Sequence, residues 1–295
     1  MSEDTTKILK GIRNKQRRQK LYADLKHEKN KAKHKARAER ATEERNDPSL
    51  KEQRLADNVP ETLDSKRVYD ETIVEDMEGE DEFDAYFASD KPPKLLLTTS
   101  KYAKKPAYEF ADLLMDFLPD VTFVKRKPQF SINDMVKFCN NREYTDLVIL
   151  NEFNKKVTGL TFIHLPEGPT FYFSITSVTE GKKIRGHGRS TDHTPELILN
   201  NFNTRLGKTV GRLFQSLFPK KPEFEGRQVI TLHNQRDYIF FRRHRYLFKS
   251  EERVGLQEIG PQFTLKLRRL QKGIRDETEW EFRPEMEKDK RKFYL

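Results

Sequence analysis

The chain has very few of the residues from which disulfides and metal sites are built. Its 295 residues include one cysteine, Cys139. A single thiol excludes an intrachain disulfide and any zinc ribbon or finger that needs several cysteines. His187 and His193 share a polar segment without a third metal-ligating residue nearby. We therefore expect no metal site, and we interpret Cys139 as a buried filler beside Phe138.

Long hydrophobic runs are also missing. No stretch approaches the roughly 18 consecutive apolar residues of a membrane-spanning helix, and the N-terminal region lacks the apolar core of a signal peptide. These absences favour a soluble protein in a reducing compartment inside the cell. Hydrophobic residues make up only 35% of the chain and charged residues another 35%, so we expect segments that order only with a partner.

Motifs for catalysis are incomplete. Gly207-Lys208-Thr209 resembles the end of a phosphate-binding loop, but Phe202 stands where the first glycine is needed, and we expect no strand before it. The segment 186–189 is too short for a dinucleotide fingerprint. No nucleophile elbow or carboxylate cluster for two metals is present. We therefore expect a protein without enzymatic activity, catalytic residues, cofactor or small-molecule substrate.

What the chain does have is positive charge, distributed in zones. The net charge is +10 and the pI is about 9.4. Residues 1–67 form a basic, helix-prone arm, interpreted as reaching RNA, as a nuclear-import signal, or as a solubilising tail. The arm cations that we assign to RNA contact or import are Lys15, Arg17, Arg18, Lys20, Lys31, Lys33, Lys35 and Arg37.

Residues 68–90 reverse the sign. They carry ten carboxylates and no lysine or arginine, which indicates an acidic linker. The interleaved Ile73, Val74, Phe83, Tyr86 and Phe87 suggest a peptide that docks on another protein, and an ordinary solvated linker is the alternative. Subtracting the first 90 residues leaves about +13 on the rest of the chain. The folded part is therefore itself basic.

Short apolar runs from residue 91 onward predict an α/β layer sandwich in residues 91–282, followed by a basic tail at 283–295. We predict strands at 94–99, 121–124, 146–150, 160–165, 170–177, 228–233, 237–248, 254–259 and 262–267. Helices are predicted at 110–118, at 132–138, from a cap at Thr194-Pro195, and over an apolar stripe from Val210 to Leu217. We expect two related halves, about 91–180 and 195–282.

Basic residues interleaved with aromatics are the candidate RNA-binding side chains. As a strand, 237–248 places Tyr238, Phe240, Arg242 and His244 on one face and Arg243 and Arg245 on the other. Alternation along 262–267 turns Lys266 and Arg268 outward. Such cations neutralise phosphates without reading base sequence. The full candidate set is Lys182, Lys183, Arg185, Arg189, Arg242, Arg243, Arg245, Lys266, Arg268, Arg269, Lys272 and Arg275.

The order of several blocks resembles the Brix family. These blocks are Gly186-His187-Gly188-Arg189, residues 195–202, Leu206-Gly207, Leu217-Phe218-Pro219, residues 229–231, 237–241 and 258–267. Gln262 stands where the family commonly has arginine. The resemblance covers roughly residues 91–280. It implies two α/β halves similar to the anticodon-binding domain of class II aminoacyl-tRNA synthetases. It also implies a nucleolar role in large-subunit (60S) assembly and rRNA maturation, with precursor ribosomal RNA and another assembly factor or ribosomal proteins as partners.

Two hypotheses remain open beside each other. In the first, the chain clamps precursor ribosomal RNA electrostatically inside the nucleus. In the second, it is a protein-interaction scaffold in a pre-ribosomal particle with little direct RNA contact. A processing nuclease is disfavoured because no metal-binding carboxylates are seen.

Overall fold

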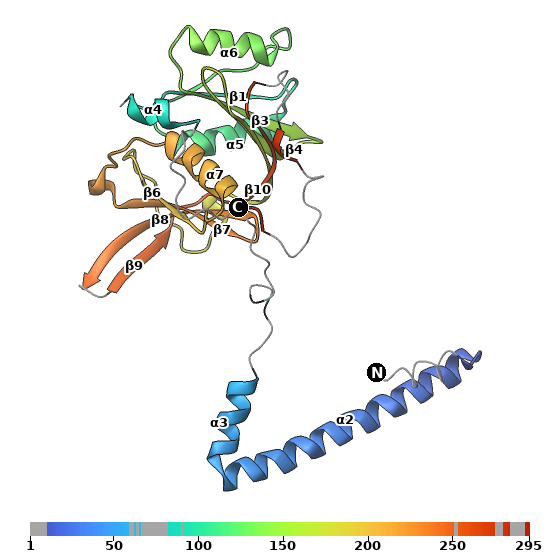
Figure 1. Cartoon of the computed structure of the whole chain (residues 1–295). Coiled ribbons are helices and arrows are strands. Elements are labelled where there is room, and N and C mark those ends of the chain that lie inside the picture. The colour runs from blue at the N-terminus through green and yellow to red at the C-terminus, as the bar shows by residue number, and fades with distance from the viewer. Residues whose placement is uncertain are drawn as a thin grey trace. The chain divides into compact units, whose positions relative to one another are not determined.

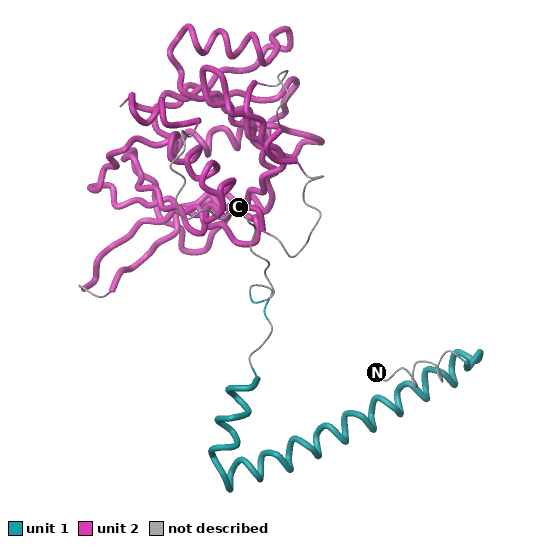
Figure 2. The backbone as a smooth tube through the Cα atoms, viewed as in Figure 1, with its two compact units in different colours: residues 1–66 teal, residues 67–295 magenta. Residues whose placement is uncertain are grey.

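A computed structural model describes residues 11–58, 62, 65, 82–89, 91–250, 253–274, 280–283 and 293–295. The chain divides into two compact units, residues 1–66 and 67–295, which Figure 2 colours separately. Each unit is described by itself below. Arg275 and most of the predicted acidic linker lie outside the described residues.

The first unit contains a long polar helix. Helix α2 spans Lys15–Asn46, and the side chain of Asn14 caps it by accepting hydrogen bonds from the backbone N–H groups of Gln16 and Arg17. None of its residues is buried, because lysine, arginine, glutamate and alanine favour a helix but supply no apolar face. All eight predicted arm cations lie on α2 and are exposed.

Helix α3 (Pro48–Asp57) follows after a single residue, Asp47, which caps it while Pro48 occupies the first turn. An ion pair between Arg54 of α3 and Glu44 of α2 joins the two helices, with nitrogen and oxygen 2.5 Å apart. This hydrogen bond lowers the pKa of Glu44. The prediction of a helical arm is therefore confirmed for the described part.

The second unit is built on one large mixed sheet (Figure 1). Its strands are β1 (Leu95–Thr99), β2 (Val121–Phe123), β3 (Asp146–Phe153), β4 (Lys156–His164), β5 (Thr170–Thr179), β6 (Glu196–Asn200), β7 (Gln228–Gln235), β8 (Tyr238–Ser250), β9 (Arg253–Glu258), β10 (Gln262–Gln271) and β11 (Trp280–Phe282). Its helices are α4 (Asp84–Ala88), α5 (Lys105–Met115), α6 (Ile132–Asn140) and α7 (Arg205–Ser216), with 3-10 turns at Gly181–Lys183 and Phe224–Gly226.

Two halves repeat one pattern of strands. In the first, β1 pairs parallel with β3, and β3, β4 and β5 follow antiparallel. In the second, β6 pairs parallel with β7, and β7, β8 and β10 follow antiparallel. The antiparallel pairing of β5 with β10 joins the halves into one sheet. The prediction of an α/β fold with two related halves is therefore confirmed.

The sheet is covered by helices on its two faces to different extents. Phe110 and Leu114 of α5 and Leu213 and Phe214 of α7 pack against strands of both halves in the main hydrophobic core. Helix α6 covers the opposite face of the first half only, where Cys139 packs with residues of β3 and β4. Strand β3 is consequently buried on both faces, which explains its unbroken apolar run.

The end of the predicted acidic linker is part of the fold. Phe83 is completely buried in the main core, and its ring lies 4.7 Å from that of His164. Arg212 of α7 pairs with Asp84 and stacks on Phe87. A solvated linker or a peptide for another protein is therefore wrong for residues 82–89, because their aromatic side chains dock on the chain's own domain.

The end of the predicted basic tail is also docked. Leu295 is 1% exposed, and the backbone N–H groups of Tyr294 and Leu295 both donate to Oδ1 of Asp237. The hydroxyl of Thr204 donates to the carbonyl oxygen of Tyr294 at 2.6 Å. Residues 293–295, the end of the predicted basic tail, therefore pack against the chain's own domain.

The helix predicted to start at Thr194-Pro195 is wrong. Residues Glu196–Asn200 form β6, because Leu197 and Leu199 alternate with more exposed residues and β7 offers a parallel partner. The helix begins later, where the hydroxyl of Thr204 accepts a hydrogen bond from the N–H of Gly207. The other predicted strands and helices are confirmed within a few residues at their ends.

Candidate nucleic-acid interface

The candidate interface is the face of β8 and β10 that points away from α5 and α7. Along β8, Ile239 and Phe241 are buried in the main core, whereas Tyr238 is 42% exposed and Phe240 and Arg242 are half-buried. Neither Tyr238 nor Phe240 belongs to a hydrophobic cluster of the described residues. This face, which we call the open face, therefore carries aromatic and basic side chains that no described helix covers.

Strand β10 adds three cations to the open face. Lys266 lies opposite Tyr238, and its ammonium sits 5.2 Å from the centre of that ring. Nε of Arg268 donates to the hydroxyl of Ser174 on β5 at 2.9 Å. A bulge between Leu267 and Arg269 sets both arginines against the single residue Tyr172 of β5. Simple alternation would turn Arg269 inward, and the bulge leaves it exposed instead.

Arg242 and the 181–189 loop both contact Glu258, at the end of β9. Nε of Arg242 lies 3.7 Å from a carboxylate oxygen of Glu258, so part of its charge is compensated within the chain. The loop is held at this place by glycines. A Cβ on Gly181 would lie 2.3 Å from the carbonyl oxygen of Ile259, and the N–H of Gly188 donates to the carbonyl of Glu258 at 2.7 Å. The loop's candidate cations Lys182, Lys183, Arg185 and Arg189 are all exposed.

Arg243 does not belong to the interface. Its side chain is 0% exposed and lies on the core face of β8, where it donates to Asp116 at 2.5 Å, to Ser190 at 2.6 Å and to Gln228 at 2.6 Å. Asp116 follows α5 of the first half, and Gln228 begins β7 of the second. The predicted phosphate contact of Arg243 is therefore wrong, because a buried guanidinium with protein partners is not accessible to RNA.

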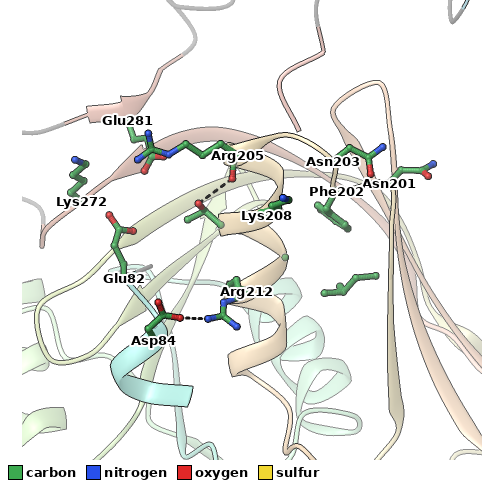
Figure 3. Close-up of a pocket in the computed structure, with 13 residues that line it drawn as sticks. Glu82, Asp84, Asn201, Phe202, Asn203, Arg205, Lys208, Arg212, Lys272 and Glu281 are labelled. Atoms are coloured by element: carbon green, nitrogen blue, oxygen red, sulfur yellow. Dashed lines mark hydrogen bonds and ion pairs between the residues drawn. The ribbon is translucent and has the colours of Figure 1, made fainter. Parts of the chain in front are cut away.

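Two more candidates are separated from the open face. Arg245 is exposed but points to the same side as Arg243 along β8. Lys272 lies beyond β10 on the side of α7, in a pocket of about 720 Å³ shown in Figure 3. The structure thus places Arg242, Lys266, Arg268 and Arg269 on the open face. The loop that carries the other four cations contacts Gln257, which lies opposite Arg245 on the other side of the hairpin.

The pocket that contains Lys272 has mixed charge. Arg205, Lys208 and Arg212 follow one side of α7, and carboxylates from Glu82, Asp84 and Glu281 share the lining (Figure 3). The three carboxylates offset most of the charge of the four cations, so the lining attracts a polyphosphate chain only weakly. We therefore leave this pocket out of the RNA interface.

The segment before Gly207 differs from the prediction, since β6 is a strand that leads toward α7. A phosphate cradle is nevertheless excluded here. The N–H of Gly207 already donates to the Thr204 hydroxyl at 2.9 Å, and a Cβ on Gly207 would lie 2.7 Å from the carbonyl carbon of Leu295. The close approach of the docked C-terminal residue explains why glycine stands at this position.

Sequence reasoning missed the partners that β5 and β7 add to the open face. Tyr172 and Ser174 of β5 and His233 of β7 have no basic neighbours in sequence. They come beside Arg269, Lys266 and Phe240 only through strand register. The sequence offered one signal for the β5 residues. Tyr172 and Ser174 alternate with apolar residues of the same strand, which predicts that they point away from the core; these apolar neighbours are all buried, namely Phe171, Phe173 and Ile175.

The described residues hold no group of three histidine, cysteine or carboxylate side chains arranged to bind a metal. Within the same residues, no helix combines the length and the apolar character needed to cross a membrane. Burial raises the pKa of the Cys139 thiol to about 11, so this cysteine is a core residue, as expected from the sequence.

The fold and the open face together define a mixed α/β protein of two related halves, with a cationic and aromatic sheet surface. A family model, the Brix domain, matches residues 100–269. Ribosome production factor 1 of Saccharomyces cerevisiae is 64% identical over 288 residues, which cover 97% of this chain and 98% of the yeast protein. The mouse protein of the same name is 45% identical over 297 residues, covering 96% and 84% of the two chains. The chain belongs to the Brix-domain family.

A solved structure is also similar to this chain. It is a probable ribosomal biogenesis protein from Aeropyrum pernix K1, with 15% sequence identity and a TM-score of 0.44, and the match covers 63% of this chain and 98% of that one.

Proposed function

We propose that this protein is a non-enzymatic ribosome assembly factor that binds precursor ribosomal RNA through the open face and supports large-subunit maturation in the nucleolus. The role in ribosome biogenesis rests on membership of the Brix family and on the names of its relatives. RNA binding, the 60S particle and the nucleolus are the finer parts of the proposal, and other assembly factors or ribosomal proteins are its protein partners.

The observation that carries RNA binding is the row of Lys266, Arg268 and Arg269 along β10. Lys266 lies over the exposed ring of Tyr238, and Arg269 lies opposite Tyr172. Cations on a sheet follow a phosphate backbone, and aromatic rings at the same surface offer stacking to unpaired bases. The exposed cations of the 181–189 loop, near the end of β9, would add phosphate contacts beside this surface. The exposed cations of α2 supply a second, separate set of phosphate contacts.

Arg268 and Lys266 are held in place before RNA arrives. The Ser174 hydroxyl orients Arg268, and the Tyr238 ring supports Lys266. A side chain that is already positioned loses less conformational entropy on binding. Such contacts neutralise phosphates by releasing counterions, and they therefore supply affinity without reading the base sequence.

The test compares two full-length triple variants of equal charge. Reversal of Lys266, Arg268 and Arg269 to glutamate removes three cations from the open face. The control reverses the exposed Lys101, Lys156 and Lys221 to glutamate, none of which lies on β8 or β10. Labelled transcripts of precursor large-subunit RNA are the probe. The open-face variant should lose about tenfold or more in affinity, and its plot of log affinity against log salt should flatten by about two units.

Equal losses in the two variants would mean that net charge alone drives binding, and no loss in either would leave the scaffold hypothesis. In cells, RNA crosslinking with nucleotide resolution should map to precursor large-subunit RNA and should collapse in the open-face variant. Depletion of the protein should lower 60S particles while 40S particles persist, and a tagged chain should collect in the nucleolus. A loss of 40S particles alone would contradict the proposed stage.

A further inference from the structure

Strands β8 and β9 form a hairpin that extends beyond the other strands of the sheet (Figure 1). Its outer part pairs Tyr246 with Leu256 and Phe248 with Val254. Opposite residues of an antiparallel pair point to the same side, so these four side chains form one apolar patch. Phe248 is 69% exposed, Leu256 is 64% and Val254 is 50%. We call these four residues the hairpin patch.

The hairpin patch is continuous with the open face. Alternate residues of a strand point to the same side. On β8, His244 and Arg242 therefore share the side of the hairpin patch, two and four residues before Tyr246. The ring centroids of Tyr246 and Phe248 lie 5.5 Å apart in an edge-to-face arrangement. The Tyr246 hydroxyl donates to the carboxylate of Glu196 on β6, which raises the pKa of Tyr246 and fixes the inner end of the patch. One surface thus changes from basic at its base to apolar at its end.

Strand β9 also leaves an edge open. Among the described residues β9 pairs with β8 alone. Residues 186–188 contact β9 at Gln257 and Glu258, the last two residues of the strand. Such an edge presents backbone donors and acceptors to an incoming strand. A two-stranded ribbon is marginally stable by itself in water, so a third strand and a covered apolar side would both stabilise it.

We propose that the β8–β9 hairpin is the docking site for an extended segment of another protein, which adds to β9 as a further strand. The segment would place apolar side chains at alternate positions over the hairpin patch and carboxylates beside Lys249 and Arg253. This inference rests on the proposed function, because the partner would be a companion in the same pre-ribosomal particle.

Two features favour protein over RNA as the occupant. Leu256 and Val254 are aliphatic, so they offer neither charge to phosphates nor a ring to bases. The sequence around the turn of the hairpin also carries both signs, with Lys249 at the end of β8, Arg253 at the start of β9, and Glu251 and Glu252 between them in the sequence. Mixed charge suits a protein surface that bears both signs, and it opposes a continuous polyphosphate chain.

The experiment uses the full-length tagged chain as the only copy in the cell, with the photo-crosslinker p-benzoylphenylalanine at position 248 or 256. The matched control carries it at Phe153, at the end of β3, which is 68% exposed against 69% for Phe248. Particles purified on the tag are irradiated and analysed by mass spectrometry. Positions 248 and 256 should crosslink to one segment of one protein, about tenfold more than position 153.

A synthetic peptide of that segment then binds the full chain in solution. Backbone amides of β9 should exchange hydrogen more slowly with the peptide present, as an added strand requires. Replacing Phe248 and Leu256 together with serine should weaken the peptide about tenfold or more, whereas F153S should leave its affinity unchanged. Unchanged affinity in the double variant would overturn the proposal.

Other crosslinking results are equally decisive. Crosslinks only to RNA, to a second copy of this chain, to many unrelated proteins, or at the yield of position 153 would each refute a specific protein partner at the hairpin. The open-face triple variant separates the two proposals. If it loses RNA and keeps peptide affinity, both hold. If the peptide binds while that variant keeps its RNA affinity, the hairpin proposal stands and the RNA interface fails.

Discussion

Replacement of Arg243 by alanine is expected to destabilise the domain without directly removing an RNA contact. The guanidinium is 0% exposed and donates to Asp116, Ser190 and Gln228, and so connects α5, the 190–193 segment and β7. The prediction opposes the simple expectation that an arginine in a basic strand binds phosphate. It thereby tests the assignment of the two faces of β8.

The magnitude follows from the groups that the substitution leaves behind. Breaking a buried ion pair by removing one partner costs about 3–5 kcal/mol. Asp116 is 46% exposed on its side-chain surface and stays hydrated, which favours the lower end of this range. Gln228, at 1% exposed, instead loses the donors to its Oε1 inside the protein. We therefore expect a loss of about 3 kcal/mol in the free energy of unfolding, which corresponds to roughly 6–12 °C in Tm for a domain of this size.

Thermal and urea unfolding of the full chain measure this loss, with Arg245→Ala as the matched control. Arg245 is exposed two residues further along the same strand, so its variant should melt with the parent. At a temperature where Arg243→Ala is folded, its RNA affinity should equal that of the parent. A variant that melts normally but binds RNA about tenfold more weakly would refute the assignment of Arg243 to the core.

Three further outcomes are expected. Phe83→Ala should lower the free energy of unfolding by about 3–5 kcal/mol, because the ring is fully buried against His164 and Phe171, and urea unfolding unaffected by it would contradict the docking of residues 82–89. Leu295→Asp should lower the free energy of unfolding by about 2–5 kcal/mol, because it puts a carboxylate where a leucine is 1% exposed. A melting curve like that of the parent would contradict the packing of residues 293–295 on the domain. Burial raises the pKa of the Cys139 thiol to about 11. At pH 8 this thiol should therefore react with an aromatic disulfide reagent far more slowly in the folded chain than in the urea-unfolded chain. Equal reaction rates in the two states would exclude the burial of Cys139. Because the thiol ionises at lower pH in the unfolded chain, the contribution of Cys139 to the free energy of unfolding should fall as the pH rises from about 9 to about 11.

The sequence by itself determined most of the helices and strands and the chemistry of their side chains, although β6 was expected to be a helix. Alternation along β8 and β10 and the helical stripe of α7 follow from the spacing of apolar residues, because the periods of strands and helices are fixed by backbone geometry. The excess of positive charge on the folded part follows from counting. The blocks that resemble the Brix family, which the family match confirms, are likewise properties of the sequence alone.

Only the tertiary structure decided which cations face solvent. Alternation divides β8 into two faces but does not say which face α5 and α7 cover, so Arg243 was assigned to RNA although it joins the two halves. The bulge that exposes Arg269, and the register that sets Lys266 on Tyr238, depend on the pairing of β10 with β5 and β8. Phe83 and Leu295 dock on partners more than 50 residues away along the chain. Such long-range contacts depend on how all the elements pack together, and no local pattern of residues encodes them.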